Sequence, residues 1–60
     1  MQIGDLVYVV GCENWDEFVG QQGKIVAINR KSHYPIIVEF DKEILGDTVG
    51  EFKYTEVELV

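Results

Sequence analysis

Five short runs of apolar and β-branched residues alternate with turn-forming residues along the chain. They span residues 5–10, 24–28, 36–40, 50–54 and 56–60. Each run has the length and composition of a β-strand. The last two alternate strictly between polar and apolar residues, which indicates one inward-facing side. No segment carries a helical pattern long enough to compete, so the pattern predicts an all-β fold.

The period-two rule also predicts which side chains are buried. Val7 and Val9 share one face of the first run, while Leu6, Tyr8 and Val10 occupy the other. The third run places Ile36, Val38 and Phe40 together by the same rule. The predicted core comprises Val7, Val9, Ile25, Ile28, Ile36, Val38, Phe40, Phe52, Val57 and Leu59.

The connections between the runs are unequal. Residues 11–22 are expected to form a long first loop, with at most a short 3-10 turn within 13–19. A polar turn is expected over 29–35 and a second long loop over 41–49. Only Thr55 separates the last two runs, which indicates a tight 3-10 corner. This layout predicts one domain over residues 1–60, a small five-stranded barrel whose closure removes exposed strand edges.

Charge limits the classes of partner. The chain has 11 acidic residues against 5 Lys and Arg, a formal charge of −6. Nonspecific nucleic-acid binding depends on cations that neutralise phosphates, so this balance disfavours it. It equally disfavours docking on anionic membranes. A protein partner with a basic surface, or simple solubility, fits better, and solubility is the favoured explanation of the charge.

The compartment is expected to be the cytoplasm. Cys12 is the single cysteine, so no intrachain disulfide forms, whereas small secreted domains usually carry several. The start of the chain lacks a basic segment followed by a long apolar stretch, so no signal peptide is predicted. No apolar run approaches the 18 residues of a membrane-spanning helix.

Several segments resemble known small barrels. Gly4-Asp5-Leu6-Val7-Tyr8-Val9 resembles the first strand of SH3-like and KOW-type domains. The segments 20–28, 34–41 and 56–59, together with Phe52, are similar to the photosystem I subunit IV family. That resemblance implies an SH3-like barrel with a long first loop and a 3-10 corner before the last strand.

The resemblance implies a fold more than a role. Subunit IV barrels lie where soluble electron carriers dock, and docking an acidic carrier requires a basic face. In this chain only Arg30, Lys31 and nearby His33 form a small basic group. We therefore carry over the fold and not the photosynthetic role. Small SH3-like proteins also occur as accessory proteins in bacteria and their phages, which is a setting that fits this chain.

No catalytic constellation is predicted. His33 lies beside Ser32 in a polar turn, where adjacent side chains seldom face each other as a nucleophile and its base must. A solvated turn residue is the better interpretation. Cys12 is followed by Glu13, Asp16 and Glu17, whose charges would oppose thiolate formation. A small, partly buried side chain is therefore expected there.

Metal and cofactor sites are likewise not predicted. One cysteine and one histidine, 21 positions apart, cannot form a zinc site. Glu13, Asp16 and Glu17 do not have the spacing of a calcium loop, and Trp15 interrupts them. No glycine-rich phosphate loop precedes a helix. We therefore expect no metal, no cofactor and no enzymatic activity.

A set of aromatic residues outside the predicted core remains unexplained: Tyr8, Trp15, Phe18, Tyr34 and Tyr54. Trp and Tyr are favoured anchors of protein interfaces. Phe18 is expected to fold back over the barrel, whereas Trp15 could equally cover the core or project as an anchor. A groove for proline-rich peptides, as in SH3 domains, would need more aromatics in register than the sequence shows.

These features lead to one main hypothesis, a non-catalytic protein-interaction module or accessory subunit. Its contact surface is the acidic, aromatic first loop with help from residues 41–49. The predicted partner-binding residues are Tyr8, Glu13, Trp15, Asp16, Glu17, Tyr34 and Tyr54. Trp15 would act as the anchor and the acids as steering charges.

Two alternatives remain open at this point. A KOW-like nucleic-acid or ribosome-associated domain would use Lys24, Arg30, Lys31 and Lys53, and salt-dependent binding of single-stranded RNA would reveal it. A small enzyme or an accessory subunit of an enzyme is the other. The first strand is apolar on both faces, so it packs either beneath a loop or against a second copy of the chain.

Overall fold

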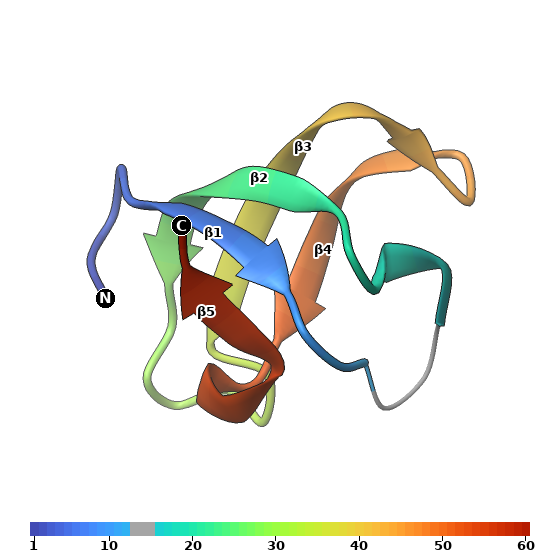
Figure 1. The fold of residues 1–60 in the computed structure, drawn as a ribbon. Coiled ribbons are helices and arrows are strands. Elements are labelled where there is room, and N and C mark those ends of the chain that lie inside the picture. Colours follow the sequence, from blue (N-terminus) through green and yellow to red (C-terminus); the bar gives the residue numbers. More distant parts are fainter. Residues whose placement is uncertain (13–15) are drawn as a thin grey trace.

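The structure is a computed structural model that describes residues 1–12 and 16–60. The described residues form five antiparallel strands in one sheet and two 3-10 turns, with no α-helix among them (Figure 1). The all-β prediction is therefore confirmed. The elements are β1 (Leu6–Val9), η1 (Asp16–Phe18), β2 (Gln22–Ile28), β3 (Ile36–Ile44), β4 (Asp47–Phe52), η2 (Tyr54–Glu56) and β5 (Val57–Leu59).

The strand order places β4 and β5 at the two ends of the sheet. The order is β4-β3-β2-β1-β5, with every neighbouring pair antiparallel. The ribbon curls so that η2 links the two terminal strands (Figure 1). The 3-10 corner before the last strand is thus confirmed, as is the 3-10 turn in the first loop. A terminal strand such as β4 has one side without a strand partner among the described residues.

The predicted loop over 41–49 is wrong. β3 continues through Asp41-Lys42-Glu43 to Ile44, and β4 begins three residues later at Asp47. The polar residues 41–43 are exposed, whereas Ile44 at the end of the strand is buried in the core. Register shifts between Glu39 and Ile44, which breaks the alternation that would have revealed the strand. The fourth strand accordingly spans 47–52 rather than 50–54.

Most of the predicted core is buried as expected. The buried apolar residues of the described chain are Val7, Val9, Phe18, Ile25, Ile36, Val38, Phe40, Ile44, Phe52 and Val57. Two predictions fail: Leu59 is 54% exposed, and Ile28 is only partly buried. Leu59 belongs to β5, a terminal strand that has a described strand neighbour on one side only. Phe18 folds inward as expected, and Ile44 is buried although the sequence pattern did not predict it.

Three phenylalanine rings from three elements meet in this core. Phe52 of β4 packs edge-on against Phe18 of η1 and Phe40 of β3, with ring centroids 5.5 and 6.0 Å away. Phe18 and Phe40 lie 5.5 Å apart. Such tilted and edge-to-face pairs add to the free energy gained by burial alone. The cluster therefore fixes η1, and with it the end of the first loop, against the β3–β4 hairpin.

The β3–β4 hairpin turns on an unusual residue. Leu45 and Gly46 form its two-residue turn, with φ values of 56° and 81°. Positive φ at both central positions is the pattern of a type I′ turn, which favours Asn-Gly. A leucine in this conformation is strained, at a cost of roughly 1–2 kcal/mol. The side chain is also 56% exposed, so burial does not repay this strain.

We predict that Leu45→Asn raises the free energy of unfolding by about 1 kcal/mol, because asparagine tolerates positive φ far better than leucine. Urea denaturation followed by circular dichroism measures this change. Thr48→Asn, which introduces the same residue elsewhere in the hairpin at an exposed position, is the control and should not stabilise the fold. Equal or lower stability of Leu45→Asn would show that the leucine is not strained in solution.

Candidate functional site

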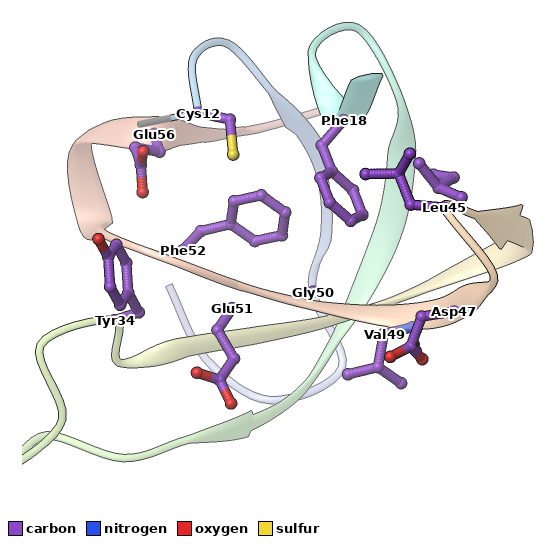
Figure 2. A pocket seen from close by; sticks show the side chains of 11 residues that line it. Cys12, Phe18, Tyr34, Leu45, Asp47, Val49, Gly50, Glu51, Phe52 and Glu56 are labelled. Atoms are coloured by element: carbon purple, nitrogen blue, oxygen red, sulfur yellow. Dashed lines mark hydrogen bonds between the residues drawn. The ribbon is translucent and has the colours of Figure 1, made fainter. Parts of the chain in front are cut away.

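A groove of about 660 Å³ runs beside β4. Its walls come from the first loop, the β3–β4 hairpin and η2, so it joins segments far apart in the sequence. The described lining residues are Cys12, Phe18, Tyr34, Ile44, Leu45, Asp47, Val49, Gly50, Glu51, Phe52 and Glu56. Figure 2 shows Cys12 and Phe18 on the first-loop side, facing β4. Tyr34 and Glu56 lie at one end and Leu45 at the other.

The floor of the groove is apolar. Phe18 and Phe52 are buried in the aromatic cluster, and the outer side of this cluster lines the groove (Figure 2). Gly50 lies between them in space: a Cβ there would come within 2.8 Å of the Phe52 ring and 3.3 Å of the Phe18 ring. Glycine is therefore needed at this position of β4 for the two rings to close over the strand.

The described charged residues that line the groove are all acidic. Among its described lining residues, Asp47, Glu51 and Glu56 are acidic, and none is a lysine, arginine or histidine. Glu56 is 8% exposed, and its carboxylate accepts a hydrogen bond from the backbone N–H of Lys53 at 2.7 Å. Asp47 and Glu51 are exposed. An apolar floor with acidic walls suits a ligand that combines apolar and basic groups.

The structure brings only part of the predicted site together. Tyr34 lines the groove. Asp16 and Glu17 are exposed in η1 and directly precede Phe18 on the groove wall. The predicted residues Glu13 and Trp15 lie outside the described residues.

The two remaining tyrosines do not line the groove. Tyr8 is on the outer face of the sheet, 38% exposed, and lies opposite Gln22 and Glu58 of the neighbouring strands. Tyr54 is 46% exposed in η2. Their exposure agrees with the prediction, but their positions place them on other surfaces of the molecule.

Tyr34 is held in place by its neighbours. The His33 ring packs edge-on against it, with centroids 4.8 Å apart, and the Lys53 ammonium lies 5.7 Å from the centre of its ring. The contact with Lys53 is a cation–π interaction. The backbone N–H of Tyr34 donates a hydrogen bond to the Ser32 hydroxyl at 3.2 Å. Tyr34 is thus a preorganised wall residue of the groove.

The residues considered above for catalysis or metal binding do not form a cluster in the described part of the chain. Cys12 is partly buried on the groove wall, and His33 is exposed in the turn between β2 and β3. Residues 1–12 and 16–60 contain no group of three His, Cys, Asp or Glu side chains that could hold a metal ion. In the same part of the chain, no helix is long and apolar enough to cross a membrane.

The basic residues are spread over the molecule. Lys24 lies near the start of β2, opposite Leu6 and Glu39, while Arg30 and Lys31 follow the end of that strand. The intervening strand is about 13 Å long at 3.3 Å per residue. Lys53 lies over the Tyr34 ring. Lys24 is therefore separated along β2 from Arg30 and Lys31, whereas Lys53 lies against the turn that carries those two residues.

Sequence reasoning predicts the region of the groove but not most of its individual residues. Residues 41–49 belong to the predicted contact surface as a loop, whereas Leu45, Val49 and Glu51 are not among the predicted binding residues. One signal was available: Leu45-Gly46 is a turn dipeptide in which leucine replaces the expected asparagine. A strained, exposed apolar residue points to a functional surface.

Comparison with known proteins yields no relative: no protein-family model matches this chain, and no curated protein matches it.

Proposed function

We propose that the chain is a non-catalytic interaction module or accessory subunit with an SH3-like barrel fold, which binds a basic segment of a partner protein in the groove beside β4. The observation that carries the proposal is the lining of the groove, an apolar floor with charged side chains that are all acidic among the described residues. Charge complementarity of this kind selects and orients basic partners.

The SH3-like assignment rests on the connectivity. A long loop follows β1, hairpins join β2, β3 and β4, and a 3-10 turn leads into β5, which pairs with β1. This succession agrees with the family resemblance of the sequence. Small barrels of this kind fill their interior with their own side chains, so binding falls to loops and outer surfaces. The groove is such a surface, because it lies between the first loop and a terminal strand.

Leu45 gives the proposal independent support. Its side chain lines one end of the groove, is 56% exposed and is held at positive φ. Asparagine would suit the turn better, and a polar residue would suit an exposed position better. A leucine that serves neither stability nor solubility is accounted for if it contacts a partner.

The test is a comparison of two charge reversals. Glu51→Lys on the groove and Glu58→Lys on the outer face of β5 change the net charge equally, and both residues are exposed. We expect Glu51→Lys to lower partner binding about 10-fold, while Glu58→Lys retains it. Each variant is immobilised, exposed to lysate of the source organism, and the retained proteins are quantified by mass spectrometry.

Equal retention of every protein by the two variants would rule out the groove as the binding surface. Equal losses in both would attribute binding to net charge alone. Leu45→Asn serves as a second variant that keeps the charge and the fold. It should weaken the same interactions that Glu51→Lys weakens, since both residues line the groove.

A further inference from the structure

We infer that the partner segment binds as an extended strand whose main chain pairs with β4 at a single residue, Glu51. This inference rests on the proposed function, because it specifies how the groove recognises its occupant. It follows from which backbone groups of β4 point away from the sheet, which the strand register determines.

The direction of each backbone group can be followed from β1 inward. The N–H of Ile25 donates to the Asp5 carbonyl at 2.9 Å, and the Ile25 carbonyl accepts from the Gly4 N–H at 2.8 Å. Ile25 therefore directs both groups toward β1. In an antiparallel sheet successive residues alternate in this respect, so Lys24 directs its groups toward β3. Its register partner Glu39 points back toward β2.

The same alternation carries through β3 to the outer strand. Val38, next to Glu39, directs its backbone groups toward β4, where Gly50 is its partner. Gly50 therefore points back toward β3, and its neighbours Val49 and Glu51 point outward. The hydrogen bond of Val49 agrees, because its N–H donates to the carboxylate of Asp47 and not into the sheet. The backbone groups that point outward along this edge thus belong to residues 49 and 51 of β4 and to Lys53, which follows the strand.

Two of these three outward N–H groups already donate a hydrogen bond within the chain. Asp47 Oδ1 accepts from the Val49 N–H at 3.2 Å, and Glu56 Oε1 accepts from the Lys53 N–H at 2.7 Å. Glu51 lies midway between them, and no other described strand pairs with its outer side. Main-chain pairing gives an added strand much of its affinity, so Glu51 is where an added strand would bond.

The side chains around this position define the occupant. Residues of an added strand alternate in direction, so one set faces the apolar floor at Phe18 and Phe52 while the other passes Glu51 and Asp47. The first set should be apolar and the second basic. The occupant is therefore an extended segment that alternates apolar residues with Lys or Arg, in contrast to a helix or a proline-rich segment lacking N–H groups.

The experiment uses the full chain and a display library of random 12-residue peptides. We expect enrichment of peptides that alternate apolar and basic residues. On saturation with such a peptide, hydrogen exchange of the Glu51 amide measured by NMR should slow at least 10-fold. The amide of Leu59 on the other terminal strand should not change. N-methylation of one peptide residue should lower affinity at least 10-fold, and N-methylation of its neighbours should not.

The outcomes separate the two proposals. Peptides that shift groove resonances while Glu51 exchange stays unchanged, or that tolerate N-methylation throughout, would overturn strand pairing and leave the proposed function intact. A library that yields no peptide, or only peptides that bind away from the groove, would overturn both. Loss of binding in Glu51→Pro, with a smaller loss in Glu51→Gln, which removes the charge but keeps the backbone N–H, would further support main-chain recognition, provided that both variants keep the circular dichroism of the native fold.

Discussion

Phe52→Ala is expected to lower the free energy of unfolding by about 3–5 kcal/mol, the cost of truncating a fully buried phenylalanine. Phe52 is 1% exposed and contacts the rings of both other phenylalanines of the chain. Removing it leaves a cavity between η1 and β3 that Gly50 has no side chain to fill. A domain of this size has a stability near the low end of about 5–15 kcal/mol, so the variant should be largely unfolded well below the wild-type melting temperature.

Urea and thermal denaturation followed by circular dichroism measure this effect. Tyr54→Ala is the matched aromatic control, since Tyr54 is 46% exposed in the adjacent 3-10 turn, and it should cost less than about 1 kcal/mol. Comparable stability of the two variants would mean that the three-ring cluster does not hold the domain together.

Gly23→Ala should lower the free energy of unfolding by about 3 kcal/mol, although it adds one methyl group. A Cβ at this buried position would lie 2.6 Å from the backbone oxygen of Glu39 and 2.6 Å from Val38 Cγ1. A real Cβ cannot approach a backbone oxygen so closely. β2 would have to move away from β3 in the centre of the sheet, which places the cost at the upper end of that of overpacking.

The control for this substitution is Gly11→Ala in the first loop. A Cβ on Gly11 meets no atom within 4 Å among the described residues, and its backbone does not require positive φ. Gly11→Ala should therefore leave stability unchanged or raise it slightly by restricting the unfolded chain. If Gly23→Ala were equally tolerated in the same denaturation series, the close packing of β2 on β3 would be refuted.

The fold was more predictable than its boundaries. Period-two alternation identified Val7, Val9, Ile36, Val38 and Phe40 as buried, because each points to the same side of a regular strand. It failed where regularity ends. The register shift in β3 hid the strand up to Ile44, and the position of Leu59 at the sheet end left it exposed. Both errors reflect tertiary context that local pattern does not contain.

The site was predictable only as a region. Charge and aromatic content indicated an acidic surface near the first loop, and Tyr34 was among the residues predicted. The groove itself depends on the register of β3 and β4, which decides that Glu51 faces outward between two filled positions. No pattern in the sequence specifies that register, because it is set by how the strands pack.

The two carboxylates that occupy the β4 edge also bear on how the chain treats copies of itself. If two β4 edges met, Asp47, Glu51 and Glu56 of each copy would face the same acids of the other, and like charges across paired strands repel. A basic strand meets no such repulsion. Under the proposed function, the β4 edge would discriminate self from partner by charge, and we expect this repulsion to oppose edge-to-edge assembly of the chain at high concentration.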